Sequence, residues 1–424
     1  MDRRSFLKVS GGLILLSACK NEYSSKDGLQ QSEFPIHIDS NSAVGHLVRS
    51  AMELPISEST SIETLIVGGG IAGLAAASSL RTNDFVVCEL DPTLGGTSGA
   101  ININGSLYSQ GAHYDLAYPN NYGKDGLQLL EKLNIIQFNG VKSLWEFQDK
   151  QYLIPSDKEE ACYDNGVMRS SILANNELKQ NFLALLKTYD NQFPLPSTSI
   201  HSDLHHLDHL TFYDYLNKYL PIDSYFIEAI DYQMLDDLGG TSNQISALAG
   251  IHYYKCRPYY NGEDLELFSP QQGNYYFIQK MAKKIATNSL LTNHLVFGMK
   301  QQNKSWYIDV YDTKQKIRKE YVTNNIVYAG QKHALKHIHP ESHASFNDVS
   351  YAPWVVVNIE LNENDLDGSK WQNDFLSPNR TFLGFVDSKI QDNKNSRVLT
   401  AYYCFPDIHH YIVKNFEASG KDLV

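Results

Sequence analysis

The feature that most constrains this chain is a buried-strand pattern that runs directly into glycines. Residues 65–67 are apolar and β-prone, and residues 72–80 are rich in Ala and Leu, which favours a helix. Between them stand three glycines with G-x-G-x-x-G spacing: Gly68, Gly70 and Gly73. In this setting the glycines allow a tight turn, a close approach to a pyrophosphate, and close helix–strand packing, respectively. We therefore expect a dinucleotide site at the helix N-terminus, lined also by Ile71 and Ala72.

A second apolar run supports this prediction. Residues 84–88 read as another buried strand and end in Glu89, 21 positions after Gly68. An acid about 20 residues beyond the first glycine binds the ribose hydroxyls in such sites, and its charge disfavours a 2′-phosphate. Leu90, which follows, is expected at the same site. Cys88 is expected to be a small buried hydrophobe.

The next segment carries a family resemblance. Residues 94–99 read Leu-Gly-Gly-Thr-Ser-Gly. Together with the glycine turn and the acid, they resemble the family of FAD-dependent amine oxidases, phytoene desaturases and protoporphyrinogen oxidases. In that family a glycine doublet after the acid runs beside the flavin half of FAD, which implies FAD-binding roles for Gly95, Gly96 and Thr97. Many members have arginine after the doublet, whereas this chain has Thr97 and Ser98.

Later segments extend the resemblance. Residues 108–113 look like the family's segment near the isoalloxazine ring, which implies Gly111, Ala112 and His113 as site residues; a structural histidine is the alternative for His113. Residues 291–296 resemble the strand whose valine contacts adenine through its backbone, so Val296 is included. Residues 270–274 look like the turn before a helix around 277–286. Residues 325–330 and 351–357 look like later strands of the family.

These observations give an expected architecture. We expect an α/β protein with a Rossmann-like FAD/NAD(P)-binding domain, formed by residues 61–115 and 285–335. A second, α+β substrate domain would comprise residues 116–284 and 336–424. The resemblance implies FAD as cofactor and an oxidoreductase that takes a hydride from a small-molecule substrate, at an amine C–N bond or a C–C bond. The sequence shows one dinucleotide fingerprint and assigns no catalytic residue.

The N-terminus predicts export. Arg3 and Arg4 precede an apolar run at residues 9–16, and Leu-Ser-Ala-Cys ends at Cys19. This order resembles a twin-arginine lipoprotein signal over residues 1–19, with lipid attached to Cys19. It implies contact with the twin-arginine export machinery and anchoring on the periplasmic or cell-surface side. A buried N-terminal helix with a chance cysteine is the alternative. Residues 20–60 read as a polar tether, with one short helix near residues 44–52.

Composition excludes several classes. The net charge of −12 disfavours nucleic acid as a partner, because phosphate backbones require clustered cations. None of the five cysteines forms a C-x-x-C pair, so neither a zinc ribbon nor a thioredoxin-like site is predicted. Beyond the N-terminus, the sequence contains no apolar run of about 20 residues, which a membrane-spanning helix requires.

Two other clusters each allow two interpretations. Histidines 201, 205, 206 and 209 alternate with Asp203 and Asp208, and i,i+4 spacing would place His205 and His209 on one α-helical face. Because no third ligand has a defined spacing, a solvated loop before a helix capped by Thr211 is the plainer interpretation, and we predict no metal site. Tyrosines 253, 254, 259, 260, 275 and 276 surround Arg257 in the sequence and would either wall a substrate pocket or fill a core.

One family element is not recognisable. Members usually close the FAD site with a C-terminal Gly-Asp segment and a final helix, and residues 404–424 contain no such pattern. This motivates an alternative hypothesis: a non-catalytic, membrane-anchored lipoprotein with a degenerate or C-terminally incomplete flavoprotein fold.

Overall fold

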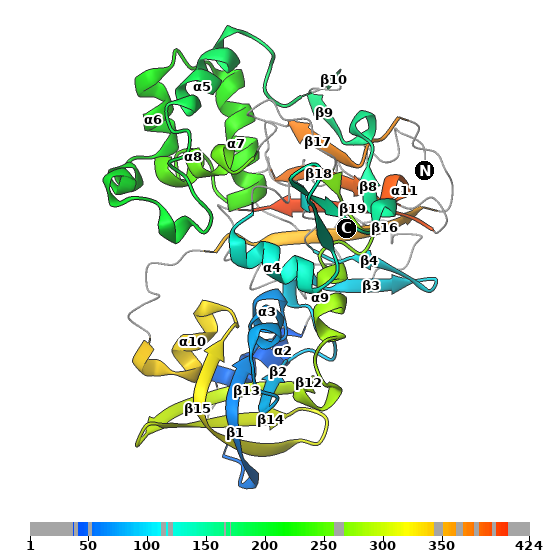
Figure 1. Ribbon diagram of the computed structural model, residues 1–424, viewed down its shortest axis with the longest axis vertical. Coiled ribbons are helices and arrows are strands. Elements are labelled where there is room, and N and C mark those ends of the chain that lie inside the picture. Colours follow the sequence, from blue (N-terminus) through cyan, green and yellow to red (C-terminus); the bar gives the residue numbers. More distant parts are fainter. Residues whose placement is uncertain are drawn as a thin grey trace, which may run out of the picture. The chain divides into compact units, whose positions relative to one another are not determined.

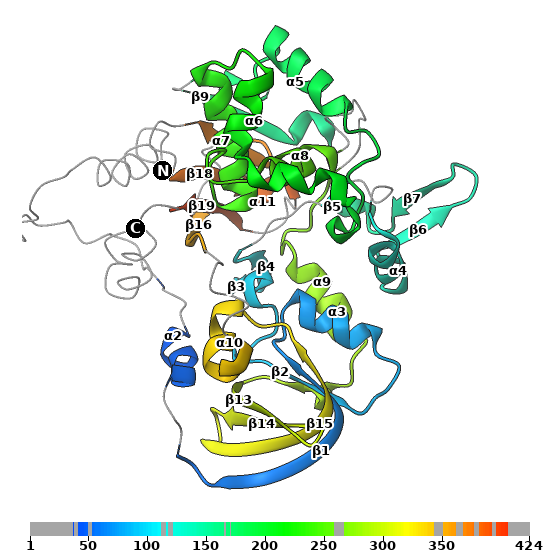
Figure 2. The same cartoon turned by 90° about the vertical axis from the view of Figure 1, so that its left-hand side faces the viewer.

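The computed structural model describes residues 37, 41–49, 53–111, 116–117, 122–164, 167–169, 171–257, 267–342, 351–361, 368–376, 381–391 and 396–405. The chain divides into two compact units (Figures 1 and 2). We call Asp39–Tyr114 with Gln272–Ser350 the glycine-motif unit. Met1–Ile38, Asp115–Gln271 and Tyr351–Val424 form the mixed unit.

The glycine-motif unit is built on a six-stranded sheet with the order β12-β2-β1-β15-β14-β13. Its strands are β1 (Ile56–Val67), β2 (Phe85–Cys88), β12 (Leu290–Leu291), β13 (His294–Gln302), β14 (Ser305–Asp312) and β15 (Ile317–Tyr328). β12, β2, β1 and β15 are parallel, whereas β13, β14 and β15 form an antiparallel meander. Figure 2 shows the long β1 and β15 side by side. Only the last four residues of β1 are buried, directly before the glycines.

This sheet curls on itself. β12 and β13 occupy opposite edges, yet only Thr292 and Asn293 separate them in the chain. The N–H of His294, at the start of β13, donates a 2.8 Å hydrogen bond to the carbonyl of Glu89, directly after β2. The enclosed face holds an apolar core that includes Leu65, Cys88, Val296, Ile308 and Val310. Cys88 is thus the small buried hydrophobe that the sequence predicted.

Helices and a hairpin complete the glycine-motif unit. They are α2 (Ser42–Gly45), η1 (His46–Arg49), α3 (Ile71–Ser79), η2 (Gly96–Ser98), β3 (Ala100–Ile103), β4 (Ser106–Ser109), α9 (Tyr275–Ala282), η9 (Thr287–Ser289) and α10 (Lys332–Ile338). α3 packs against β1, β2 and α9 and buries Gly73, Leu74, Ala77 and Ser78. The helix predicted around residues 277–286 corresponds to α9.

The mixed unit contains a second six-stranded sheet, with the order β10-β9-β17-β18-β19-β16. Its strands are β9 (Glu160–Asp164), β10 (Val167–Arg169), β16 (Trp354–Leu361), β17 (Gln372–Leu376), β18 (Phe382–Asp387) and β19 (Arg397–Cys404). Neighbouring strands are antiparallel except β9 and β17. Helices of this unit lie together in one bundle (Figure 1): α5 (Glu177–Lys187), α6 (Phe212–Tyr219), α7 (Ser224–Leu238) and α8 (Ala247–Lys255).

Shorter elements connect these parts of the mixed unit. The strands are β5 (Leu116–Ala117), β6 (Ile136–Asn139), β7 (Leu144–Phe147), β8 (Leu153–Ile154) and β11 (Leu267–Phe268). The helices are α4 (Lys124–Lys132), η4 (Lys150–Tyr152), η5 (Ser156–Lys158), η6 (Ser197–Ser199), η7 (Ser202–His209) and α11 (Ser388–Gln391).

Local capping explains where the bundle helices begin. Thr211 Oγ1 accepts a 3.0 Å hydrogen bond from the N–H of Asp214, so the predicted cap of α6 is confirmed. Asp223 caps α7 in the same way, with a 2.7 Å bond from the N–H of Phe226. Gly239 follows the last residue of α7, and its φ of 70° lies in the left-handed region that favours glycine.

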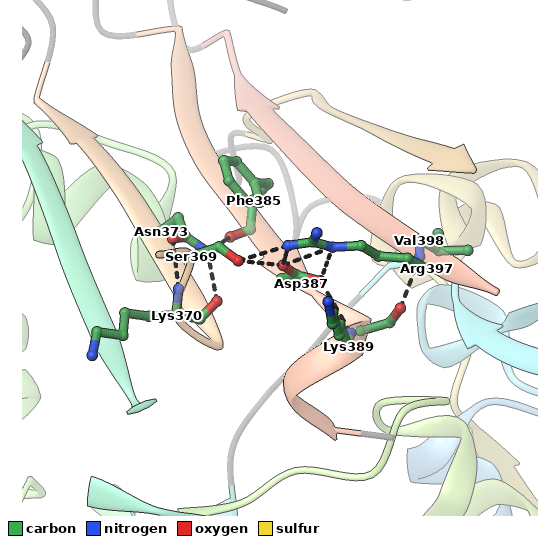
Figure 3. A network of polar contacts seen from close by, with 9 residues as sticks. Ser369, Lys370, Asn373, Phe385, Asp387, Lys389, Arg397 and Val398 are labelled. Atoms are coloured by element: carbon green, nitrogen blue, oxygen red, sulfur yellow. Dashed lines mark hydrogen bonds and ion pairs between the residues drawn. The ribbon is translucent and has the colours of Figure 1, made fainter. Parts of the chain in front are cut away.

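A buried ion pair joins β18 to β19 (Figure 3). Asp387 is fully buried and Arg397 is 6% exposed. Arg397 Nε lies 3.1 Å from both carboxylate oxygens of Asp387, and Ser369 Oγ donates to Asp387 Oδ2 at 2.6 Å. Arg397 Nη2 also donates to Ser369 Oγ at 2.8 Å. These hydrogen bonds offset part of the free energy that the two charged groups lose when they are removed from water.

The architecture is the expected combination of an α/β unit with a second, α+β unit, while the boundaries differ from those read in the sequence. β1 already begins at Ile56, within the expected tether of residues 20–60. α2 with η1 covers residues 42–49, where the sequence predicted one short helix near residues 44–52. α9 belongs to the glycine-motif unit rather than to the range assigned to the substrate domain. α9 belongs to this unit because it packs against α3. Contacts between segments so far apart in the chain leave no local signal in the sequence.

The histidine cluster does not form the α-helix that metal binding by His205 and His209 would require. η7 is a 3₁₀ helix with about three residues per turn, so side chains four positions apart point about 120° away from each other. His205 and His209 consequently do not share a face. Among the residues that the structure describes, no three His, Cys, Asp or Glu side chains are grouped so that they could hold a metal ion.

Candidate dinucleotide-binding site

The glycine turn has the geometry that its motif requires. Gly68 has a φ of 101°, and a Cβ at this position would lie 2.9 Å from the carbonyl oxygen of Ala329. A Cβ on Gly73 would lie 1.9 Å from the carbonyl oxygen of Gly68. Side chains are therefore excluded at both positions: at the first by the turn, and at the second by the close packing of α3 on the end of β1.

The N-terminus of α3 is open to a ligand. Its first intrahelical hydrogen bond runs from the N–H of Leu74 to the carbonyl of Gly70, at 3.0 Å. By helix geometry, the N–H groups of the three preceding residues, Ile71, Ala72 and Gly73, have no intrahelical acceptor. Ile71 is 43% exposed, which is high for a large apolar side chain. Unsatisfied donors at the positive end of a helix form a site for an anion such as a pyrophosphate.

Glu89 is the buried acid of this site. It is 7% exposed, its Oε2 accepts from the N–H of Gly69 at 2.6 Å, and its Oε1 accepts from the N–H of Asp91 at 2.8 Å. Burial raises the pKa of Glu89, while the backbone donors of Asp91 and Gly69 lower it. Each oxygen keeps a further lone pair, so the carboxylate suits a pair of ribose hydroxyls.

The glycine doublet lies beside the first turn. Gly95 and Gly96 have φ values of 134° and 55°, and the N–H of Gly95 donates to the carbonyl of Gly69 at 3.0 Å. Gly70 and Gly95 form a parallel β-bridge. The backbone runs of the two glycine motifs are thus in contact, although about 25 residues separate them in the sequence.

The remaining predicted residues are only partly brought together. A Cβ on Gly111 would lie 2.2 Å from the carbonyl oxygen of Thr97, so these two predicted positions are adjacent. Leu90 is half-buried. Val296 is 3% exposed and its side chain lies in the core of the curled sheet, which leaves its backbone for any ligand contact. Ala112 and His113 lie outside the described residues.

Sequence reasoning missed two backbone partners of Glu89. Gly69 donates to its carboxylate, and a Cβ on Gly69 would lie 2.6 Å from Leu94 Cδ2 and 3.0 Å from Glu89 Cβ. The uninterrupted glycine triplet was the available signal for this position. Asp91 donates through its N–H, an interaction that depends on a turn of the backbone and has no side-chain signature.

Two tyrosines of the predicted cluster, Tyr253 and Tyr254, lie in the core of the mixed unit. Tyr254 is fully buried and Tyr253 is 7% exposed. The Arg257 guanidinium lies 3.7 Å from the centre of the Tyr253 ring and pairs with Asp237. These residues pack α8 into the helical bundle. Tyr259 and Tyr260 lie outside the described residues.

Known proteins support this reading of the fold. The profile of the NAD(P)-binding Rossmann-like domain family matches residues 66–131. A variant of putrescine oxidase with redesigned cofactor binding is 15% identical, with a TM-score of 0.62 over 86% of this chain and 79% of the other. A fatty acid isomerase from P. acnes is 14% identical, with a TM-score of 0.58 over 85% and 83% of the two chains.

An oxidoreductase from Methanosarcina mazei is similar to the same degree, at 13% identity and a TM-score of 0.59 over 85% of this chain and 84% of the other. No protein of curated function matches the sequence significantly. Fold and site thus define a protein with a Rossmann-like dinucleotide-binding domain. More specifically, the fold is similar to that of putrescine oxidase and of the other two proteins.

None of the helices in the described parts of the chain is long and apolar enough to cross a membrane.

Proposed function

We propose that this chain is an FAD-dependent oxidoreductase. The observation that carries the proposal is the pairing of an open helix N-terminus at Ile71 with the buried carboxylate of Glu89. These two groups suit a pyrophosphate and a ribose diol, which are joined in every dinucleotide. The resemblance of residues 94–99 to the amine oxidase group, together with the similarity to putrescine oxidase, favours FAD over a nicotinamide cofactor.

The residues of this chain fit such a cofactor. The backbone at Gly70, Ile71 and Ala72 would hold the pyrophosphate, and Glu89 would hold the adenosine ribose. The Gly95–Gly96 segment and Gly111 would bind the flavin half, where glycines leave room for close approach. When bound, FAD supplies the acceptor for a hydride, and the protein contributes orientation and exclusion of water.

The proposed substrate is a small organic molecule that is oxidised at an amine C–N bond or a C–C bond. The names of two proteins of similar fold point to substrate classes to test: putrescine, an amine, for the oxidase, and a fatty acid for the isomerase. Because one fold hosts many reactions, similarity of fold supports these two substrate classes and does not select between them.

We further propose that the protein is exported as a lipoprotein anchored through Cys19. The support is the order of Arg3-Arg4, an apolar run and the Leu-Ser-Ala-Cys sequence. A route that carries folded proteins suits a protein that acquires its cofactor before export.

Flavin content tests the enzymatic proposal. Purified protein should be yellow and contain about one FAD per chain, and anaerobic addition of substrate should bleach the flavin absorbance. A panel of amines and unsaturated acyl or polyene compounds would identify the class. Colourless protein that gains no flavin on reconstitution would instead support the alternative of a non-catalytic lipoprotein.

A further inference from the structure

The segment before the first strand is folded onto the glycine-motif unit. In this segment, where the sequence predicted a tether with one short helix, residues 42–49 form α2 and η1, and Asn41 precedes α2. Asn41 Nδ2 donates a 2.7 Å hydrogen bond to Asp91 Oδ1, and the N–H of Gly45 donates to the carbonyl of Asn41 at 3.0 Å. The start of this segment is therefore fixed to the loop that follows β2.

That loop contains the acid of the candidate site. The N–H of Asp91 donates to Glu89 Oε1 at 2.8 Å, and the carbonyl of Asp91 accepts from the N–H of Asn293 at 3.0 Å. Asp91 thus makes three hydrogen bonds that connect different segments. Its N–H binds the Glu89 carboxylate, its carbonyl binds the turn between β12 and β13, and its side chain binds Asn41. Asn41 is two hydrogen bonds away from the Glu89 carboxylate.

The rest of the segment contacts the same side of the unit. Val48 packs against the core cluster that contains Val296, and η1 adjoins both β13 and α10. A Cβ on Gly45 would lie 3.6 Å from Leu90 Cδ2, which is ordinary van der Waals contact. Leu90 and Val296 are two positions that the sequence analysis assigns to the cofactor, the second through the family resemblance. Residues 41–49 consequently lie along the part of the unit that is expected to bind adenosine.

We propose that residues 41–49 are a strap that belongs to the cofactor site, and that Asn41 is a positioning residue which fixes the Glu89–Asp91 loop for ribose binding. This inference rests on the proposed function, because it takes FAD as the ligand. The physical reason is preorganisation: a loop held in its binding conformation loses less conformational entropy when the ligand arrives. The strap also links retention of the cofactor to the chain segment that follows the expected lipid anchor.

Three variants of the full-length mature chain test the role of Asn41. Asn41→Ala removes the hydrogen bond to Asp91 and should weaken FAD binding about fivefold, because one such bond is worth about 1 kcal/mol. Asn41→Asp places two carboxylates together and should weaken binding further. Asn41→Asp combined with Asp91→Asn reverses donor and acceptor and should restore binding. The matched control is Ser59→Ala, which removes a hydrogen bond to Glu320 on an exposed part of the same unit.

The readout is the dissociation constant for FAD, from fluorescence titration of apoprotein, alongside the melting temperature of each apoprotein. If the wild type binds no FAD, the proposed function fails. If the wild type binds FAD and the three variants bind equally well, or if the exchanged pair binds no better than Asn41→Asp, the strap proposal is overturned. Should a variant fail to fold, hydrogen exchange of the wild type decides: FAD must increase protection of residues 41–49, and unchanged protection contradicts the proposal.

Discussion

The N–H of Gly69 lies 2.6 Å from Oε2 of Glu89, and this bond joins the turn after the first strand to the end of the second. Glu89 is only 7% exposed, and burying a carboxylate without hydrogen-bond donors would destabilise the fold. The N–H groups of Gly69 and Asp91 supply those donors before any ligand is present. The acid is thereby held in one orientation beside the open end of α3.

Replacing this acid should weaken cofactor binding while the fold persists. Glu89→Gln keeps the shape but removes the charge from hydrogen bonds to a ribose diol. Hydrogen bonds to charged groups are worth roughly 1.5–3 kcal/mol, so we expect an increase of about 10- to 100-fold in the dissociation constant for FAD. Fluorescence titration of the apoprotein with FAD measures this dissociation constant. Glu341→Gln is the control, because the Glu341 side chain is 88% exposed, and equal binding by both variants would remove Glu89 from the ribose role.

A methyl group at Gly73 should disrupt the glycine-motif unit. Its Cβ would lie 1.9 Å from the carbonyl oxygen of Gly68, so α3 must move away from β1. We expect Gly73→Ala to cost about 3 kcal/mol or more of stability, at the upper end of overpacking effects. Thermal unfolding and soluble yield are the measurements. Gly140→Ala, where no heavy atom lies within 4 Å of the added Cβ, should melt near the wild type; a wild-type melting temperature for both variants would contradict the packing.

Asp374 should make stability depend on pH. This fully buried residue accepts hydrogen bonds from Tyr232 Oη at 2.8 Å and Gln372 Nε2 at 2.9 Å, and burial raises its pKa from 3.8 to about 6. Between these values the native state binds a proton that the unfolded state has released. Stability should therefore fall as pH rises from about 4 to above 6, by about 3 kcal/mol in all.

The amide side chain of the variant Asp374→Asn cannot ionise, so the variant should not lose stability in that pH window. We therefore expect the unfolding free energy of the variant minus that of the wild type to increase as pH rises. Urea titrations at pH 4.5 and 7.5 would measure it. Asp208→Asn, at an exposed position, serves as the comparison and should leave the pH profile unchanged. A constant difference between Asp374→Asn and the wild type at both pH values would show that Asp374 does not titrate in this range.

The ion pair between Asp387 and Arg397 should be costly to break from one side. Asp387→Ala leaves a buried guanidinium without its counter-charge, and we expect a loss of about 3–5 kcal/mol. Asp387→Leu combined with Arg397→Met removes both charges and should recover most of that loss. Guanidinium chloride unfolding of the three chains tests the pattern. If the double variant is as unstable as the single one, geometry rather than charge determines the contribution of this pair.

Export should depend on the two arginines. A chain with Arg3→Lys and Arg4→Lys should accumulate in the cytoplasm as unprocessed precursor, because both residues of the proposed signal are replaced. Cys19→Ala should be exported but should not incorporate labelled fatty acid. Fractionation and metabolic labelling measure these outcomes, and export with lipidation of the double-lysine chain would refute the twin-arginine route.

The most local parts of the structure were predictable. The glycine turn, α3 and Glu89 all lie within about 25 residues, and their roles follow from backbone conformation and the spacing of one βαβ unit. The Thr211 cap was predictable for the same reason, since it involves residues three positions apart. At residues 202–209, by contrast, spacing alone could not distinguish an α-helix from a 3₁₀ helix, whose histidines point in different directions.

By itself, then, the sequence determined that this protein has a dinucleotide turn and the acid that accompanies it, because those features are encoded by neighbours along one strand–helix–strand segment. Only the tertiary structure decided that Asn41 holds Asp91, that α9 packs with α3, and that the edges of the sheet meet near His294. Each of these contacts joins segments about 50 to 200 residues apart. Their free energy comes from burial and hydrogen bonding between complementary surfaces, which no short stretch of sequence contains.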